Sequence, residues 1–138
     1  LLPIGVPPAE ETLSMARELV DMAKSSGVRI KVLGSTDLTH YGSNYGFTNR
    51  GTGAEAVDWV RNTNDRRMIE AMEAMDAQRV IREALENQNA CCAGAVGAAI
   101  AAARRLGAEK ARTLEYASSY DKRPAESFVG YVGMVFEA

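Results

Sequence analysis

The chain has 138 residues, of which 46% are hydrophobic and 25% are charged, and its formal net charge at pH 7 is −2. These values are typical of one globular domain with a core of its own. The near-neutral charge provides neither the basic surface that binds nucleic acid nor a polybasic arm for a membrane. No apolar run reaches the ~20 residues of a membrane span, so we expect neither nucleic acid nor a membrane as partner.

The first third of the chain has the pattern of a strand, a helix and a second strand. Residues 1–6 form a short apolar run that ends at Pro7 and Pro8. Residues 9–26 carry acidic side chains early, apolar side chains three and four positions apart, and a glycine stop at Gly27, which predicts an amphipathic helix. Residues 28–34 alternate between apolar and polar side chains, as a strand does. We therefore expect a parallel βαβ unit.

Residues 35–53 are predicted to form a long loop at the carboxyl end of the second strand. The segment is rich in glycine, asparagine, serine and threonine, and it also carries Tyr41, Tyr45 and Phe47. Ligands bind at the carboxyl ends of strands in open α/β sheets. A loop of this length inside a compact domain is usually functional, so we expect the binding site here.

The remaining residues predict four helices and then two strands. The helices are expected at residues 54–61, 65–75, 77–87 and 93–106, with Asp76 as an N-cap and Gly107 as a stop. The strands are expected at residues 111–117 and 128–136. The predicted fold class is α/β, with a three-layer-type sheet that combines the parallel βαβ unit and the carboxyl-terminal strands and is flanked by helices. We expect one domain over residues 1–138.

His40 is the only histidine of the chain, and Asp37 lies three residues before it. A lone histidine is most often structural, hydrogen-bonded to a carbonyl, and an aspartate in a loop often forms an Asx turn. At a junction between strand and loop, however, a carboxylate can also orient an imidazole as a metal ligand or as a base. The structural and the functional interpretation are both compatible with the three-residue spacing of Asp37 and His40.

The two cysteines, Cys91 and Cys92, are adjacent. Neighbouring residues rarely form a disulfide because their Cα atoms are too close together, so we expect free thiols and a cytoplasmic location. A thiol at the amino end of a helix favours the thiolate form, although free cysteines are more commonly small buried hydrophobic residues. Together with Asp37 and His40, a cysteine would suit iron, zinc or copper.

The order of several motifs resembles the carboxyl-terminal half of the Memo family, known in prokaryotes as AmmeMemoRadiSam system protein B. The resemblance runs through nearly the whole chain, and the segment from Ser35 to Gly42 is similar to the Ser-Ser-Asp-x-x-His-aromatic-Gly motif of the family. Further similar segments are Leu2-Pro3-Ile4, Met75-Asp76, Asn89-Ala90-Cys91-Cys92, Leu114-Glu115-Tyr116-Ala117-Ser118-Ser119 and Ser127-Phe128-Val129-Gly130-Tyr131. The resemblance implies the fold of class III extradiol dioxygenases.

The resemblance also implies roles for individual residues. It places His40 in a metal-binding pocket, Asp37 beside it as a direct or supporting ligand, and Cys91 as the pocket thiol, while Cys92 stands where the family usually has glycine. Two further histidines of the family's pocket belong to its amino-terminal half. We therefore expect this chain to be the carboxyl-terminal portion of a longer protein and to bind metal weakly by itself. An exposed apolar face for the missing half, able to drive formation of a homodimer, is also expected.

The functional expectation is a metal-dependent oxidoreductase related to the dioxygenases, with Fe²⁺ in the complete protein and copper or zinc as alternatives. His40, Asp37 and Cys91 are the expected catalytic and metal-binding residues. The alternative is a non-catalytic module that binds a metal ion or a peptide in the same cleft. The substrate, a small molecule or a peptide, is not identified by the sequence.

Overall fold

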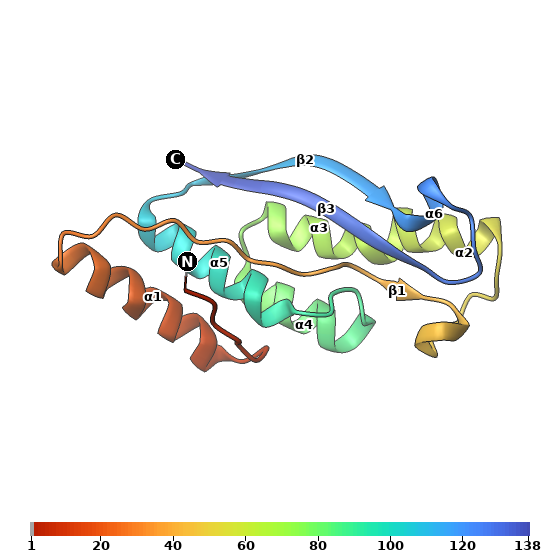
Figure 1. Cartoon of the computed structure of the whole chain (residues 1–138), viewed down its shortest axis with the longest axis horizontal. Helices are drawn as coiled ribbons and strands as arrows, with labels where there is room; N and C mark the ends of the chain where they lie inside the picture. The colour runs from red at the N-terminus through yellow and green to blue at the C-terminus, as the bar shows by residue number, and fades with distance from the viewer. Residues whose placement is uncertain (1) are drawn as a thin grey trace.

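A three-stranded antiparallel sheet and a set of helices make up the computed structural model, which describes residues 2–138 (Figure 1). The strands are β1 (His40–Tyr41), β2 (Lys110–Ser118) and β3 (Phe128–Glu137), in the order β1-β3-β2. The α-helices are α1 (Glu10–Ser25), α2 (Ala54–Trp59), α3 (Asp65–Glu73), α4 (Ala77–Asn87), α5 (Ala93–Leu106) and α6 (Ser119–Lys122). In the part of the chain that the structure describes, no helix has the length and apolar character to cross a bilayer.

The predicted helices and carboxyl-terminal strands are confirmed. The Asp76 side chain accepts a hydrogen bond from the Arg79 backbone N–H and so caps α4. Gly107 ends α5 with a φ of 103°, a conformation that costs glycine little and other residues more. Strands β2 and β3 pair over nearly their whole length, with Ala117 opposite Tyr131. These elements are specified by local periodicity and by caps, so the sequence alone locates them.

The expected parallel βαβ unit is not present in the described residues. Neither residues 2–6 nor residues 28–34 pair with another strand, and Leu1 of the first expected strand lies outside the described residues. Most side chains of residues 28–34 are exposed, with Leu33 90% exposed, while Ile30 is partly buried against the core of α1 and α5. An apolar alternating segment becomes a strand only where a neighbouring strand accepts its backbone hydrogen bonds. The α/β class is therefore confirmed only in the broader sense of a mixed helix and sheet protein.

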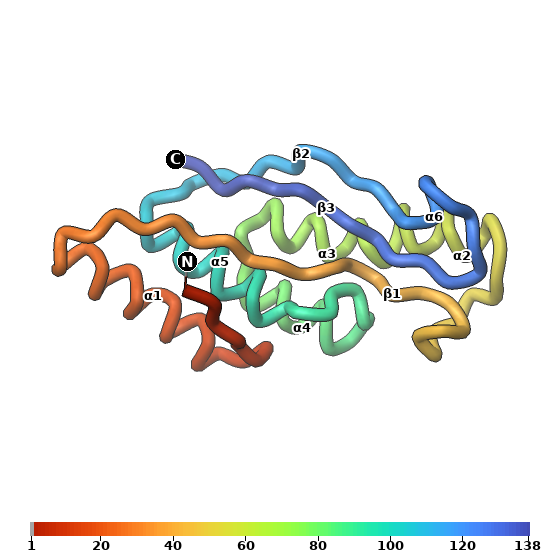
Figure 2. The backbone as a smooth tube through the Cα atoms, viewed as in Figure 1, coloured from red at the N-terminus to blue at the C-terminus, as the bar shows by residue number. Residues whose placement is uncertain are grey.

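The main core lies between the sheet and the helices α3, α4 and α5. Buried side chains of these helices pack with residues of β2 and β3 that point to the same side, namely Tyr116, Val132, Met134 and Phe136. Helix α1 packs on α5 through a second core that contains Leu13, Val20 and Ala102. The layers are thus the sheet, the α3–α5 helices and then α1, as Figure 2 allows the reader to trace.

Helices α2 and α3, predicted as separate helices, are joined without a break. A π-helical turn, Val60–Asn64, connects them. Such turns are rare and are often found at functional sites. In this chain Asn64 and Asp65, which end the turn and begin α3, are both buried and bond to Thr39, the residue before His40.

Candidate metal centre

The position of His40 is fixed by the pairing of β1 with β3. His40 lies opposite Val129 in the register. Just before it, the Leu38 N–H donates to the Gly130 carbonyl at 2.9 Å, and the Gly130 N–H donates to the Thr39 carbonyl at 3.0 Å. The prediction that His40 follows a buried strand at residues 28–34 is wrong, because this segment is unpaired. His40 instead begins a strand of two residues at the edge of the sheet.

The Asp37 carboxylate orients the imidazole of His40. His40 Nε2 lies 3.2 Å from Asp37 Oδ2, and the two side chains are 34% and 44% exposed. The ring of Tyr45 packs against the imidazole with the ring centres 4.9 Å apart. A carboxylate and a neighbouring aromatic ring restrict the imidazole to one orientation, and this prepares it to act as a ligand or as a base.

Cys91 is brought to this pair by reciprocal contacts between residues 36–37 and 91–92. The Asp37 N–H donates to Cys91 Sγ at 3.3 Å, and the Cys91 N–H donates to the Asp37 carbonyl at 3.2 Å. The Thr36 hydroxyl accepts the Cys92 N–H at 2.9 Å and lies 3.6 Å from Cys91 Sγ. Two segments more than fifty residues apart are therefore held together at the site.

The geometry of the three predicted side chains fits a single metal ion. One ligand atom each from Asp37, His40 and Cys91 lie within 4.8 Å of one another. Two atoms bonded to one ion at ~2.1 Å and at a right angle lie ~3 Å apart, close to the distance from His40 Nε2 to Asp37 Oδ2, and opposite ligands lie ~4.2 Å apart. Small rotations of the side chains would suffice, and a donor set of oxygen, nitrogen and sulfur suits iron, zinc or copper.

Cys92 lies next to this cluster. Its sulfur is 3.7 Å from Cys91 Sγ, and both cysteines are exposed and free. The hydrogen-bonded contact with Cys91 is the main influence that raises the pKa of the Cys92 thiol, and the charge of Cys91, burial and the charge of Asp37 add to it. Cys92 occupies the N-cap position of α5, but its side chain caps no N–H of the helix.

A buried polar network behind the cluster holds the residue that precedes His40. Asp65 is fully buried and accepts hydrogen bonds from the Thr39 N–H at 3.0 Å, from the Thr39 hydroxyl and from the Tyr116 hydroxyl at 2.7 Å. Burial raises the pKa of Asp65, although the bonds from Thr39 and Tyr116 act in the opposite direction. Burial first, and then the Asp65 carboxylate, raise the pKa of Tyr116.

The network continues to the segment that carries Cys91. Asn64 Nδ2 donates to the Thr39 hydroxyl at 3.0 Å, and Asn89 Nδ2 donates to the Asn64 carbonyl at 3.0 Å. Asn89 is fully buried and also lies 3.4 Å from the Glu83 carboxylate. One set of buried bonds therefore positions both Thr39, beside His40, and Asn89, two residues before Cys91.

Several residues of the site have contacts that no sequence pattern predicted. Thr36 joins the two segments, Asp65 supports Thr39, and Tyr131 on β3 is affected by the charge of Asp37. Burial first, and then the charges of Asp37 and Tyr45, raise the pKa of Tyr131. Thr36 and Tyr131 belong to segments that resemble Memo motifs, and this resemblance could have indicated that they lie near the site. No local pattern distinguishes Asp65 from other acidic residues of the helices.

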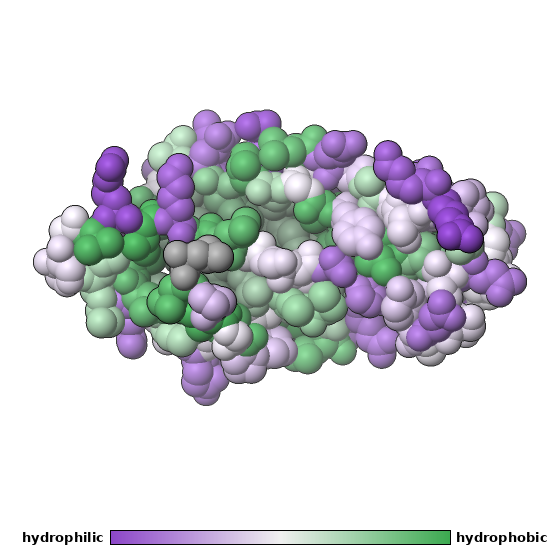
Figure 3. All heavy atoms as spheres, viewed as in Figure 1, coloured by the Kyte–Doolittle hydropathy of each residue, from purple (hydrophilic) through white to green (hydrophobic). Residues whose placement is uncertain are grey.

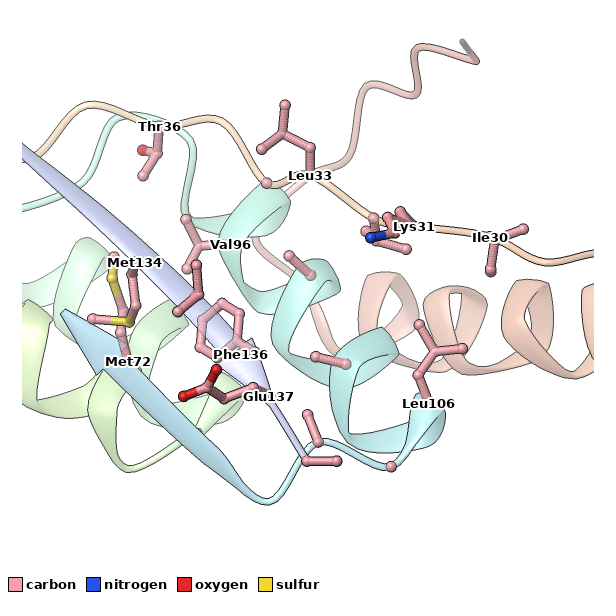
Figure 4. Close-up of a pocket in the computed structure, with 18 of the residues that line it drawn as sticks. Ile30, Lys31, Leu33, Thr36, Met72, Val96, Leu106, Met134, Phe136 and Glu137 are labelled. Atoms are coloured by element: carbon pink, nitrogen blue, oxygen red, sulfur yellow. The ribbon is translucent and has the colours of Figure 1, made fainter. Parts of the chain in front are cut away.

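An apolar groove begins beside the cluster and follows α5. Its volume is about 510 Å³, and Thr36 belongs to its lining. Figure 4 shows side chains of α5, of the extended segment 30–36 and of the end of β3 around it, and Figure 3 shows apolar side chains gathered over this part of the molecule. Labelled lining residues include Ile30, Val96, Leu106, Met134 and Phe136.

Both long sides of this groove have free backbone hydrogen-bonding groups. Strand β3 pairs with β1 at Phe128 and Val129, and Gly130 bonds to Leu38 and Thr39 just before β1, whereas residues 131–137 pair with β2 alone. Among the described residues, the segment 29–36 forms no backbone hydrogen bond with β3. The groove therefore lies between two extended segments that are separated from each other.

Comparison with known proteins identifies close similarity to one family. The model of the Memo-like protein family matches residues 1–135. A MEMO1 family protein of Pyrococcus horikoshii is 31% identical over 97% of this chain and 47% of its own length. Another from Thermococcus kodakarensis is 30% identical over 96% of this chain and 46% of its own length. A third, from Methanopyrus kandleri, is 33% identical over 93% of this chain and 42% of its own length. The chain thus spans about half the length of these relatives.

Proposed function

Because this chain belongs to the Memo-like protein family, we propose that Asp37, His40 and Cys91 bind one transition-metal ion and that the complete protein is a metal-dependent oxidoreductase related to the class III extradiol dioxygenases. The observation that carries the proposal is the convergence of three different ligand types. A carboxylate, an imidazole and a thiol from two distant segments have ligand atoms within 4.8 Å of one another.

Each side chain has a distinct role in this proposal. These side chains would hold the ion, with Fe²⁺ expected and copper or zinc as alternatives, and the bound ion would supply redox chemistry with O₂ as the oxidant. His40 supplies a nitrogen ligand, or a base where the metal is held by other groups, and Asp37 keeps its ring in place. Cys91 supplies a sulfur whose position is fixed by the Asp37 N–H.

The proposed site is only partly contained in this chain. The chain has one histidine and covers about half the length of its relatives. We propose that the other half of a full-length family member supplies further ligands, including the histidines that the family resemblance implies. The chain alone is expected to bind metal more weakly than the complete protein.

We propose that the same other half also covers the groove with an extended segment. Two observations support this occupant: the groove has unpaired backbone groups along both sides, and apolar side chains such as Leu33 and Val32 stand in solvent beside it. A strand inserted here would pair with both edges and cover apolar surface. Occupation by an unrelated peptide or by a second copy of the chain is the alternative outcome of the tests below.

A non-catalytic metal-binding or peptide-binding module is the second candidate function. The observation that favours it is the sulfur of Cys91, since the ferrous oxygenases that bind O₂ commonly use two histidines and one carboxylate. The two functions differ in oxygen consumption, because a binding module holds its metal without turnover.

The test is an anaerobic metal titration combined with a measurement of oxygen uptake. Reduced protein would be dialysed against Fe²⁺ and, in parallel, Zn²⁺, and then exposed to O₂. We expect one ion per chain and at least a ~10-fold loss of affinity in His40→Ala and in Cys91→Ser, since even supporting residues of metal sites contribute this much. Asn44→Ala, an exposed neighbour whose side chain is outside the cluster, serves as the control.

Three outcomes decide between the candidates. Oxygen uptake above that of free Fe²⁺, lost in His40→Ala, supports the oxidoreductase. Metal binding with the expected variant pattern but without uptake supports the binding module. Affinity that is unchanged in both His40→Ala and Cys91→Ser would overturn the metal site itself.

A further inference from the structure

We infer that Cys92 is a fourth ligand of the proposed metal site, so that Cys91 and Cys92 chelate the same thiophilic ion, of which Zn²⁺ and Cd²⁺ are the simplest examples. This inference rests on the proposed metal site and extends it. It assigns a role to an exposed sulfur that the cluster of Asp37, His40 and Cys91 does not include.

The distance between the two sulfurs is that of two thiolates bound to one ion. Cys91 Sγ and Cys92 Sγ lie 3.7 Å apart. A zinc–sulfur bond is ~2.3 Å, so two sulfurs at a tetrahedral angle about one zinc ion are ~3.8 Å apart. The two sulfurs therefore already have the spacing for chelation, and a rotation of the Cys92 side chain would bring its sulfur to the ligand atoms of Asp37 and His40, since Cys92 lies outside the set within 4.8 Å.

The surroundings of the pair keep both sulfurs available. The backbone of Cys92 is fixed by its N–H bond to the Thr36 hydroxyl, while its side chain forms no cap on α5. Both cysteines are exposed. A disulfide between them would need the sulfurs at ~2.04 Å and Cα atoms at least ~4.4 Å apart, whereas adjacent Cα atoms are ~3.8 Å apart.

A second sulfur changes which ion the site prefers. Sulfur ligands select zinc and other thiophilic ions, while oxygen and nitrogen ligands suit the harder ferrous ion better. Two sulfurs, the imidazole nitrogen of His40 and a carboxylate oxygen of Asp37 would complete a four-coordinate shell of the kind that zinc adopts.

Cadmium titration of the reduced chain tests the inference directly. The near-ultraviolet charge-transfer band of cadmium arises from bound thiolates, and Cys91 and Cys92 are the only cysteines of the chain. We expect one Cd²⁺ per chain, a band at saturation in Cys92→Ser that is about half that of the original chain, and an affinity at least ~10-fold weaker. Cys92→Gly should behave in the same way, and thermal unfolding of each variant checks that it is folded.

The outcomes separate this inference from the proposed function. An unchanged band per bound ion in Cys92→Ser, or two ions per original chain, would overturn chelation by the pair. If the proposed site were wrong and the pair acted alone, His40→Ala would leave Cd²⁺ affinity unchanged while Cys92→Ser still halved the band. If both are right, each of the two variants weakens binding, and only Cys92→Ser halves the band.

Discussion

Asp65 supports the candidate site from within the core. Its carboxylate is fully buried, and it accepts bonds from Thr39 and Tyr116. An unpaired buried donor costs about 1–3 kcal/mol of stability. The bonds from Thr39 to Asp65 therefore fix the backbone of the residue before His40. Without them, the start of the short strand β1 would be free to move.

The raised pKa of Asp65 gives a pH dependence of stability. The folded state holds a proton on Asp65 at pH values where the unfolded chain, with an ordinary pKa of ~4, has released it. Between these two pKa values, stability due to this residue falls as pH rises. We expect Asp65→Asn to remove this slope from urea unfolding curves measured from about pH 4 upward. Identical pH profiles for both proteins would contradict the assignment.

Asp37 is expected to contribute to metal affinity through its charge. Asp37→Asn keeps the size of the side chain and its contact with His40 but removes the negative charge. We expect metal affinity to fall by about tenfold or more, measured by isothermal titration calorimetry. Asp58→Asn is the matched control, because Asp58 is bonded only to the exposed Asn62 side chain. An equal effect of both variants would mean that general charge, and not ligation, is responsible.

At this scale the sequence allowed part of the site to be predicted. Asp37, His40 and Cys91 could be selected from their residue types and from a motif of recognisable order. Thr36 and Asp65 could not be assigned their roles, because their functions depend on contacts with residues 55 and 26 positions away along the chain. Such contacts follow from the tertiary fold and have no local sequence pattern.

At the scale of elements, β3 and α3 approach each other closely at Gly130. Gly130 is buried opposite Ser118 in the sheet, and a Cβ atom at this position would overlap Asp65 Oδ2. At Gly133, three residues further along the same strand, an added Cβ atom would lie 3.9 Å from Leu114 Cβ, an ordinary contact distance.

Alanine substitutions at these two glycines test that junction. We expect Gly130→Ala to destabilise the protein by about 1–3 kcal/mol, since the Asp65 carboxylate would have to move away from its partners. Gly133→Ala is expected to change stability by less than ~0.5 kcal/mol. Urea denaturation compares the two variants, and equal stabilities would show that Asp65 is not packed against β3 as described.

The elements also explain why some predictions were right and others wrong. Helices such as α4 and α5 form hydrogen bonds within themselves, so that periodicity and caps specify them. The segment 28–34 has the alternation of a strand, but it lacks a partner among the described residues. The join between α2 and α3 was missed because a π-helical turn has no characteristic sequence pattern.

At the scale of the whole molecule, the chain has an extended, unpaired edge on its surface. Leu33 is 90% exposed and Val32 is 47% exposed beside the groove. Such an edge is a template for pairing with another strand, which agrees with the proposal that the other half of a family member covers it. The expected self-association of the isolated chain would use the same surface.

Hydrogen exchange can determine whether this edge is free. In dilute solution we expect backbone amides of residues 29–36 to exchange rapidly, while amides of β2 that bond to β3 exchange slowly. If protection of residues 29–36 appears only as protein concentration rises, a second copy occupies the groove. Protection equal to that of β2 at every concentration would contradict a free edge in the single chain.

The most direct test of the central claim is X-ray absorption spectroscopy of the metal-loaded chain. With Zn²⁺ bound, the metal's nearest neighbours should include sulfur and an imidazole nitrogen, since Cys91 and His40 belong to one cluster with Asp37. We predict that imidazole scattering disappears in His40→Ala and that sulfur scattering decreases in Cys91→Ser. A coordination shell made of oxygen atoms alone, unchanged in both variants, would contradict the account.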